Sequence, residues 1–376
     1  MGLFNFGNKK GDSVIGIDVG SSSVKIVQLR KRRGIAVLET YGELSLGPYA
    51  GSEIGQATNL PSIKIAEAIT DLIRESNVTT IKAGISIPFS SSLISLISMP
   101  ALGKDKLAAM IPIEARKYIP VPISEVMLDW FIVPSKEESP SPENESVEIE
   151  KEKDEFVKKI EVLLVAIHNN TLNKYNEIVQ TTKLDVGFFE IEVFSAIRAV
   201  IGQSITPVMV LDMGASATKL YLVEYGVVKA SHVINSGAQN ITQTLSVSLG
   251  ISIIKAEELK RDFGISQDSP NKNEETASSK EIITLGLDRI FTEAGKVFLQ
   301  YQQKHNKNIG NVILTGGGAT MKGILPLAKK HFEVEVSLGN PFSKVESPAF
   351  FENVLKDVGP EFAVAVGLAL RKLQEE

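Results

Sequence analysis

Two short segments of the sequence, about half a chain apart, carry the same residue types at the same spacing. Asp18 precedes Lys25 by seven positions in the first segment, and Asp212 precedes Lys219 by seven positions in the second. Small residues lie within each segment and β-branched residues flank it, which predicts a strand, a tight turn and a second strand. One copy is equally consistent with an ordinary Gly-rich hairpin. Two copies with the same internal spacing favour a duplicated functional turn.

The chemistry expected of such a turn is phosphate binding. Small residues let the backbone N–H groups of the turn approach an anion closely, and such a concavity binds phosphate. An aspartate at the end of the first strand is placed to hold hydrated Mg²⁺, which prefers one or two carboxylates together with waters and phosphate oxygens. Two such turns facing each other would clamp a nucleotide from both sides.

A glycine-rich segment near the far end of the chain fits the same kind of site. An apolar strand runs into Gly316, Gly317 and Gly318. Consecutive glycines let the backbone lie flat against a base or a phosphate. A helix is expected to begin at Thr320, a good N-cap residue.

A charged pair provides the fourth motif. Glu257 and Lys260 lie one turn apart on one face of a predicted helix, which Gly264 ends. From that face they can reach ribose hydroxyls and the edge of a base. A salt-bridged helix surface explains the pair equally well when it is considered alone.

In chain order, the two phosphate turns, the Glu-x-x-Lys helix and the Gly-Gly-Gly turn resemble the actin, Hsp70 and sugar kinase superfamily. Residues 114–129, 340–342 and 359–371 are similar to segments of the PilM family of type IV pilus assembly proteins, in the FtsA-like branch of that superfamily. The resemblance covers essentially the whole chain. It implies an α/β fold of the actin-like two-lobe ATPase type with an inserted ferredoxin-like (1C-type) subdomain, and it implies ATP and Mg²⁺ as cofactors.

The resemblance also implies a role for each matching residue. Asp18 and Asp212 would hold Mg²⁺ through its water shell, and Lys25 would reach phosphate oxygens. Glu257 and Lys260 would flank the adenosine. The remaining expected ligands are Gly20, Ser21, Ser22, Gly214, Ala215 and Ser216 at the phosphates and Gly316, Gly317 and Gly318 at the adenosine.

One further assignment concerns hydrolysis. On a predicted helix over residues 191–201, Glu192 and Arg198 fall where relatives hold a water-orienting carboxylate or amide. Glu192 is therefore the candidate catalytic residue. Because an arginine in place of an amide would orient water poorly, the expectation is ATP binding with at most slow ATPase activity.

Composition restricts the class of protein. A chain of 376 residues, 43% of them hydrophobic, is long enough for two or three packed subdomains. A net charge of −5 without a long basic stripe argues against nucleic acid as the main partner. The sequence has no cysteine, and its four histidines show no metal-ligand spacing. Its apolar runs are too short to span a bilayer, so we expect a cytoplasmic protein, which by resemblance is peripheral to the inner membrane through its partners.

The predicted elements divide the chain into two lobes and one inserted subdomain. From residue 92 the expected order is strand, helix, strand, strand, helix, strand, as in a ferredoxin-like split unit. An acidic stretch rich in Ser and Pro inside this unit has too few apolar residues to order itself. The expected boundaries are 1–13 for a flexible tail, 14–91 plus 343–376 for the first lobe, 92–190 for the inserted subdomain with a disordered loop at 135–155, and 191–342 for the second lobe with a polar loop at 266–280.

Partner binding is expected in the inserted subdomain. Tyr118, Ile119 and Val121 form an apolar elbow stiffened by prolines, which would be either ordinary core or a groove for a short extended peptide. By resemblance the partner is the cytoplasmic N-terminal peptide of the inner-membrane protein PilN, and the favoured function is a nucleotide-regulated adaptor. The alternatives are a filament-forming cell-division protein like FtsA, which would self-associate, and a small-metabolite kinase, for which the sequence offers no positioned base.

Overall fold

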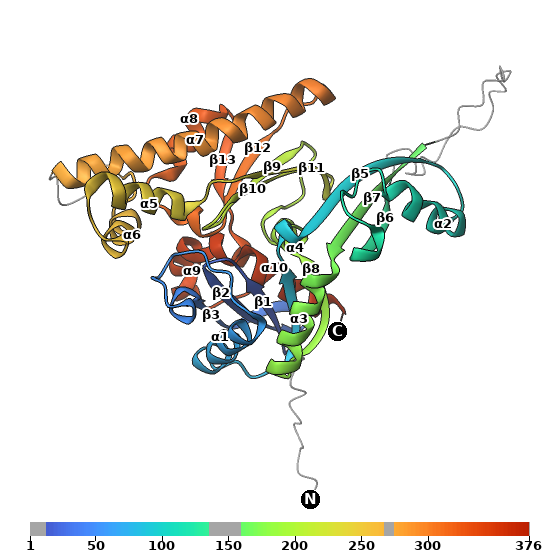
Figure 1. Cartoon of the computed structure of the whole chain (residues 1–376), viewed down its shortest axis with the longest axis horizontal. Helices are drawn as coiled ribbons and strands as arrows, with labels where there is room; N and C mark the ends of the chain where they lie inside the picture. Colours follow the sequence, from blue (N-terminus) through green and yellow to red (C-terminus); the bar gives the residue numbers. More distant parts are fainter. Residues whose placement is uncertain (1–12, 135–158, 267–273, 376) are drawn as a thin grey trace, which may run out of the picture. The chain divides into compact units, whose positions relative to one another are not determined.

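The computed structural model describes residues 13–134, 159–266 and 274–375 (Figure 1). The expected tail ahead of residue 13, the acidic loop 135–155 and part of the polar loop 266–280 lie outside these residues. The chain forms two compact units, of which the first comprises Met1–Phe89 and Lys174–Glu376 and the second Ser90–Asn173. Within the described residues, no helix combines the length and the apolar character that crossing a membrane requires.

The first unit contains two sheets of the same design. The order in the first sheet is β3-β2-β1-β4-β8, with antiparallel pairing among the first three strands and parallel pairing beyond. These strands are β1 (Ser13–Val19), β2 (Ser23–Arg32), β3 (Ile35–Ser45), β4 (Lys82–Ile87) and β8 (Asp185–Ile191). β1 and β2 are mostly buried because helix α10 packs on both of them and helix α1 packs on β2 and β3.

The second sheet repeats this arrangement. Its order is β11-β10-β9-β12-β13, again with three antiparallel strands followed by two parallel ones. The strands are β9 (Val208–Met213), β10 (Thr218–Glu224), β11 (Val227–Ile234), β12 (Asn311–Thr315) and β13 (Glu335–Leu338). The duplicated sequence motif therefore belongs to a duplicated sheet, and each sheet is the centre of one lobe.

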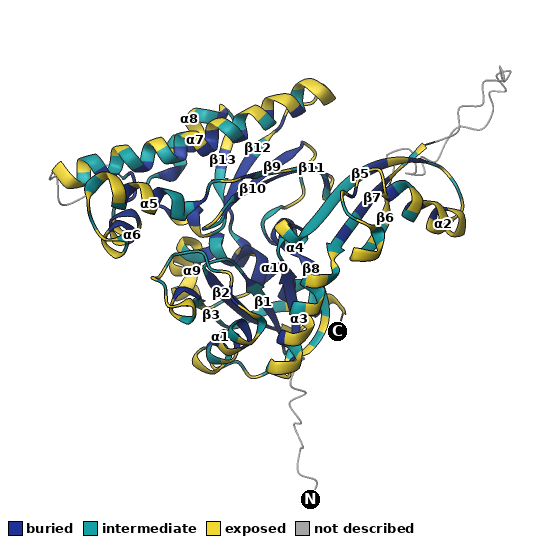
Figure 2. Cartoon of the chain, viewed as in Figure 1, coloured by how far each residue is buried: buried dark blue, intermediate teal, exposed yellow. Residues whose placement is uncertain are grey.

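The remaining elements of the first unit cover the sheets and connect them. The helices are α1 (Ser62–Glu75), α3 (Asn169–Thr182), which begins in the second unit, α4 (Glu192–Val200), α5 (Ala238–Leu249), α6 (Ile253–Asp262), α7 (Glu274–His305), α8 (Ile324–Phe332), α9 (Glu352–Val358) and α10 (Ala363–Glu375). The 3₁₀ turns are η1 (Gly47–Ala50), η2 (Phe89–Ser91), η5 (Gly317–Thr320), η6 (Pro341–Lys344), η7 (Ala349–Phe351) and η8 (Gly359–Phe362). Figure 2 shows that the buried residues follow the strands of both sheets.

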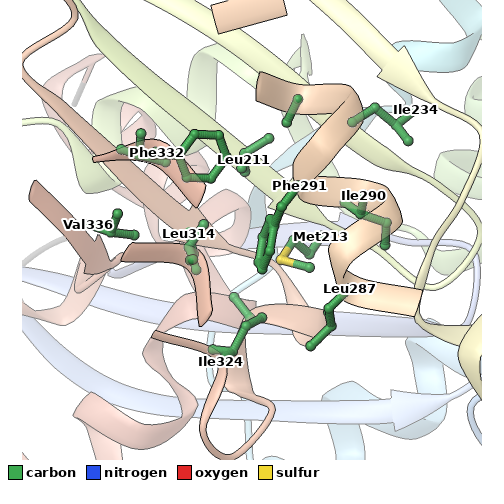
Figure 3. Packing of buried hydrophobic residues seen from close by; sticks show 14 of the residues in the cluster. Leu211, Met213, Ile234, Leu287, Ile290, Phe291, Leu314, Ile324, Phe332 and Val336 are labelled. Atoms are coloured by element: carbon green, nitrogen blue, oxygen red, sulfur yellow. The ribbon is translucent and has the colours of Figure 1, made fainter. Parts of the chain in front are cut away.

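The core of the second lobe lies between its sheet and helices α7 and α8. Figure 3 shows Phe291 of α7 at the centre of this core, with Leu211 and Leu314 coming from the sheet. Phe291 is completely buried, and its ring lies 5.8 Å from that of Phe332 in α8. Close aromatic and aliphatic packing of this kind holds α7 on the sheet.

The start of the second lobe differs from the prediction. The sequence boundaries assign helix α4 to the second lobe, but it packs against α10. Its residues Ala196 and Ala199 belong to the same hydrophobic core as Val27 and Leu29 of the first sheet. Small residues permit this close approach, since Gly367 of α10 lies against the backbone of Ser195. The second lobe therefore begins with β9, and α4 belongs to the first.

The second unit is a three-stranded antiparallel sheet with helix α2 (Lys104–Ala115) packed on it. Its order is β5-β7-β6, with β5 (Ser92–Pro100), β6 (Val126–Val133), which follows the 3₁₀ turn η3 (Ile123–Glu125), and β7 (Lys159–His168). Leu107 and Ile111 of α2 share a core with Leu164 of β7.

The predicted ferredoxin-like arrangement over residues 92–190 is wrong in one respect. The expected last strand, β8, pairs in parallel with β4 in the first sheet and not with the strands of the second unit. A strand pattern has the same period in whichever sheet the strand lies. The pattern could therefore predict the strand, but not that it would pair with the free edge of β4.

Candidate functional site

A cavity of about 330 Å³ in the first unit is lined by both duplicated turns. Every residue predicted to bind nucleotide or to act in hydrolysis, except Arg198, lines it. These residues are Asp18, Gly20, Ser21, Ser22, Lys25, Glu192, Asp212, Gly214, Ala215, Ser216, Glu257, Lys260, Gly316, Gly317 and Gly318. Their sequence positions span almost the whole of the first unit, so the fold brings together motifs that are far apart in the chain.

The two duplicated turns, at residues 20–23 and 214–217, have matching backbone geometry. The amide of Gly20 donates to the carbonyl of Ser23 at 3.0 Å, and the amide of Gly214 donates to the carbonyl of Ala217 at the same distance. A Cβ atom on either glycine would lie 3.0 Å from that carbonyl oxygen. The duplication therefore extends from the sequence to the hydrogen bond that closes each turn.

The Gly-Gly-Gly turn is fixed by the segment that precedes α10. Gly316 has a φ of 82°, a backbone conformation that favours glycine. Its amide donates to the carbonyl of Pro360 at 2.8 Å, and the Thr315 hydroxyl donates to the same oxygen at 2.6 Å. The prediction that a helix begins at Thr320 is wrong. Thr320 is the last residue of the short turn η5, and α8 begins only after Gly323, which has a φ of 84°.

Lys219 connects two carboxylates of the cavity. Its ammonium lies 2.6 Å from Glu192 and 3.3 Å from Asp212. Burial alone would lower the pKa of Lys219, but Asp212 and Glu192 together raise it above its ordinary value. Glu192 also accepts a hydrogen bond from the amide of Phe89 at 2.6 Å. Both oxygens of the candidate catalytic carboxylate are therefore engaged by protein donors.

Asp18 is the second-last residue of β1 and lines the cavity. The hydroxyl of Ser86 donates to its carboxylate at 2.8 Å. Burial, and after it the charge of Glu192, raises the pKa of Asp18 to about 6. A dication next to this carboxylate would favour its ionised form. The donor chemistry of Asp18 and Asp212 thus fits a hydrated Mg²⁺, whose preferred partners are carboxylates and water.

Glu257 and Lys260 form a buried ion pair in α6. The ammonium of Lys260 lies 2.6 Å from Glu257, and Arg261 contacts the other carboxylate oxygen at 2.7 Å. The hydroxyl of Thr242 in α5 donates to Glu257 at 2.7 Å. Burial alone would raise the pKa of Glu257, but the charge of Lys260 and the hydrogen bonds to the carboxylate lower it below its ordinary value. The carboxylate is therefore ionised. Because the pair is buried and lines the cavity, it is not an ordinary salt bridge of a solvated helix surface.

Four charged residues that line the cavity are missing from the sequence prediction: Lys219, Glu43, Arg261 and Glu361. The sequence could have indicated Lys219, because it occupies the same position in the second copy of the duplicated segment as Lys25 does in the first. Arg261 lies in the predicted helix of Glu257 and Lys260, and Glu361 lies in the family-like segment 359–371, but neither had a predicted role, and Glu43 belongs to no motif. They reach the cavity only through the positions of β3, of the end of α6 and of the segment before α10.

Glu43 and Glu361 form an acidic group around Lys25. The ammonium of Lys25 lies 2.9 Å from Glu43. Although burial raises the pKa of Glu43, Lys25 lowers it below its ordinary value. Burial, and after it the charge of Glu43, raises the pKa of Glu361 to about 7. Lys25, the residue expected to reach phosphate, is therefore held by a carboxylate of its own lobe.

Arg198 does not take the position that the sequence implied. Its guanidinium contacts both oxygens of Glu190 at 2.7 Å and donates to the carbonyl of Gly367 at 3.2 Å. It therefore stabilises the packing of α4 and α10 and does not line the cavity. The reason is helical geometry, because residues 192 and 198 lie on different faces of α4. The position of Arg198 therefore gives no support to the prediction that hydrolysis is slow.

The three residues of the apolar elbow differ in exposure. Ile119 is only 6% exposed and belongs to the hydrophobic core of the second unit, and Val121 packs against that core. Tyr118 is 41% exposed. Most of the elbow is therefore core, and Tyr118 alone among the three presents a large exposed surface.

Comparison with known proteins identifies the family. A family model described as type IV pilus assembly protein PilM matches residues 16–373. The cell division protein FtsA of Enterococcus faecalis is 29% identical over 167 residues, which are 40% of this chain and 37% of that protein. FtsA of Helicobacter pylori strain J99 is 32% identical over 184 residues, 43% of this chain and 36% of that protein. The chain thus spans less than half the length of these curated relatives.

Solved structures share the fold. A PilM-PilN type IV pilus biogenesis complex has a TM-score of 0.77 at 20% identity and covers 96% of this chain and 98% of that chain. The ethanolamine utilization protein EutJ from Carboxydothermus hydrogenoformans has a TM-score of 0.54 at 14% identity, over 96% of this chain and 89% of that chain. The predicted α/β actin-like ATPase fold is therefore confirmed.

Proposed function

Because the chain belongs to the family of type IV pilus assembly proteins PilM, we propose that it binds ATP with Mg²⁺ in the cavity of its first unit and acts as a nucleotide-regulated adaptor in pilus assembly. The single observation that carries the nucleotide site is the pair of phosphate turns. They are closed by the same backbone hydrogen bond and line one cavity from two lobes. An adaptor of this kind would work in the cytoplasm, peripheral to the inner membrane.

Different groups of residues would handle each part of the nucleotide. Backbone amides of the two turns would bind phosphate oxygens, while Lys25 and Lys219 would compensate phosphate charge. Asp18 and Asp212 would hold the water shell of Mg²⁺, which itself neutralises phosphate and orders it in the cavity. The buried carboxylate of Glu257 would accept hydrogen bonds from ribose hydroxyls.

Hydrolysis, if it occurs, is proposed to be slow. A general base must reach the proton that it abstracts, and both oxygens of Glu192 already accept hydrogen bonds, one of them from the ammonium of Lys219. With both oxygens engaged by protein donors, Glu192 is poorly placed to accept a proton from an attacking water. We expect turnover below the typical enzyme range of about 1–10³ s⁻¹, and turnover within that range would contradict the adaptor role.

The proposed partner is the cytoplasmic N-terminal peptide of PilN, because a solved structure with the same fold is a PilM-PilN complex. The second unit offers a suitable surface. Met127 and Phe131 point to the same side of the edge strand β6 and are 60% and 45% exposed. An exposed edge strand flanked by apolar side chains can accept an extended peptide.

The nucleotide proposal is tested by measuring the affinity of the purified protein for Mg-ATP by isothermal titration calorimetry. We expect Asp18→Ala and Gly317→Val to lose at least tenfold in affinity, and Asp357→Ala, an exposed aspartate outside the cavity, to bind as the wild type does. If both cavity variants keep the wild-type affinity while folded, the site is wrongly assigned.

The adaptor proposal is tested by fluorescence anisotropy with a labelled peptide from the N-terminus of PilN, with and without Mg-ATP. Tyr118→Ala and Phe131→Ala should weaken peptide binding while nucleotide affinity stays unchanged. Ile205→Ala is the control, since this residue is 87% exposed and belongs to the first unit. Equal binding by all three variants would exclude the second unit as the docking surface.

A second candidate function is FtsA-like filament formation, which the sequence similarity to FtsA favours. Sedimentation of the protein with Mg-ATP decides between the two functions. An adaptor is expected to remain in the supernatant at concentrations at which it binds the peptide, whereas a filament-forming protein would pellet in the presence of nucleotide.

A further inference from the structure

The segment between η1 and α1, residues 51–60, belongs to no motif, yet it contacts the nucleotide cavity. It contains no helix or strand, and we call it the strap. Gly55, in its middle, lines the cavity. Ile54 next to it is 53% exposed. The strap therefore has one side toward the cavity and the other toward solvent.

The strap is attached to the first phosphate turn. The amide of Thr58 donates to the carbonyl of Ser21 at 2.8 Å, and its hydroxyl donates to the same oxygen at 3.2 Å. At its end, the carbonyl of Leu60 accepts a hydrogen bond from Lys174 at 2.7 Å. The position of the strap thus depends directly on the turn that is proposed to hold phosphate.

The strap is also attached to the second lobe. The amide of Ala57 donates to Oε1 of Gln239 in α5 at 2.8 Å. The amide of Gln239 in turn donates to the carbonyl of Ala215 in the second phosphate turn at 3.0 Å. Gln239 therefore links the strap to the second turn, as Thr58 links it to the first.

The middle of the strap meets the nucleoside end of the cavity. Gly55 has a φ of 86°, and a Cβ atom added to it would lie 2.8 Å from the carboxylate of Glu257. The absence of a side chain lets the backbone lie against the carboxylate that is also paired with Lys260 and Arg261. Only glycine combines this backbone conformation with this close approach.

We propose that the strap is the wall of the nucleoside end of the site and that Gln239 is the positioning residue that holds it closed. This inference rests on the proposed nucleotide function and adds the route of nucleotide access and release to it. The strap joins the two lobes beside Glu257, so its opening would widen access to the nucleoside end of the cavity. Opening requires breaking the hydrogen bond between Ala57 and Gln239, while the attachment at Thr58 makes the strap sensitive to phosphate in the first turn.

The first test removes the link to the second lobe. In stopped-flow measurements with a fluorescent N-methylanthraniloyl ATP and Mg²⁺, Gln239→Ala should release nucleotide about 2- to 10-fold faster than the wild type, as expected for one net hydrogen bond. Gln243→Ala is the matched control, because it removes the same side chain from an exposed position of the same helix. Unchanged release by Gln239→Ala, at an unchanged melting temperature, overturns the proposal.

The second test moves the strap away from Glu257. Gly55→Ala should weaken nucleotide binding by at least tenfold, since the added Cβ displaces the strap. Gly34→Ala shares the strained backbone, with a φ of 83°, but has no atom within 4 Å, and it should bind as the wild type does. Equal losses in both variants would mean that backbone strain, and not the contact with Glu257, accounts for the effect, and would contradict the proposal.

Hydrogen exchange without nucleotide separates this inference from the proposed function. Amides of the strap should exchange about 2- to 10-fold faster in Gln239→Ala than in the wild type or Gln243→Ala. If strap amides exchange faster in Gln239→Ala but the wild type binds no nucleotide, the proposed function fails and the strap cannot be the wall of a nucleotide site. If the wild type binds nucleotide but exchange is unchanged, the proposed function stands and Gln239 does not hold the strap.

Discussion

Several carboxylates are held close together around the cavity, and two of them have unusual proton affinities. The pKa of Asp18 is raised to about 6 and that of Glu361 to about 7, in both cases chiefly by burial and then by a neighbouring carboxylate. Lys25 and Lys219 compensate part of this charge through their ion pairs. A cavity with excess buried negative charge favours a nucleotide that arrives with its dication, since Mg²⁺ and protons relieve the same repulsion.

Glu361→Gln tests the cost of this charge. We expect the free energy of unfolding to rise by on the order of 1–2 kcal/mol at pH 8 and to stay nearly unchanged at pH 4. The folded protein keeps the proton on Glu361 up to about pH 7, whereas an unfolded glutamate releases it near its usual pKa of 4.5. Stability is therefore lost as the pH rises through this window, and the variant avoids that loss.

Urea titrations at the two pH values measure the effect of Glu361→Gln. Glu335→Gln, at an exposed position of β13, is the control and should change stability at neither pH. A gain for Glu361→Gln that is as large at pH 4 as at pH 8 would show that ionisation of this residue is not the cause.

Lys219→Met removes the cation that lies between Glu192 and Asp212. We expect it to destabilise the protein by about 3 kcal/mol, at the low end for a buried pair because the Lys219 side chain is 19% exposed. Nucleotide affinity should fall with it. Lys255→Met, at a lysine that is 51% exposed in α6, should be nearly neutral. Urea unfolding and calorimetry measure both effects, and a neutral Lys219→Met would show that the two carboxylates do not need this cation.

At the scale of elements, the long helix α7 is held to the second sheet by a few large side chains. Phe291 is completely buried among residues of the sheet and of α8, whereas Leu285 on the same helix is 62% exposed. The helix packs against residues of β9 and β12 in one hydrophobic core, and these strands lead into the second duplicated turn and the Gly-Gly-Gly turn. Packing at a distance from the site thus positions two of its three turns.

Phe291→Ala is expected to lower the free energy of unfolding by about 3–5 kcal/mol, because it leaves a cavity that the rigid sheet cannot close. Leu285→Ala on the same helix should change it by less than about 0.5 kcal/mol. Equilibrium urea unfolding compares the two variants. Similar losses would mean that helix propensity, and not packing, determines the contribution of α7.

At the scale of the whole molecule, the site exists only because two lobes of equal topology contribute equivalent turns to one cavity. A ligand that binds the folded protein alone stabilises it by RT ln(1 + [L]/Kd), about 2.7 kcal/mol at a hundredfold excess over Kd. Mg-ATP should therefore slow hydrogen exchange in the β1–β2 turn and in the β9–β10 turn together. Protection of one turn alone would contradict binding between the lobes.

The sequence by itself determined the local chemistry of this protein. The spacing from Asp18 to Lys25 and its repetition from Asp212 to Lys219 predicted both turns. The Gly-Gly-Gly motif and the Glu-x-x-Lys helix predicted five further residues that line the cavity, namely Glu257, Lys260, Gly316, Gly317 and Gly318. These signals are readable because turn geometry, helix faces and strand alternation depend on residues a few positions apart.

The tertiary structure alone decided which distant segments became neighbours. It placed β8 beside β4, directed Arg198 toward Glu190 and brought Glu43, Glu361 and the strap to the cavity. None of these contacts has a local pattern, because they depend on which sheet edge was free and on how closely α4 and α10 could pack. The residues that would bind the nucleotide could thus be read from the sequence, while those that set the charge of the site and enclose it followed from long-range packing.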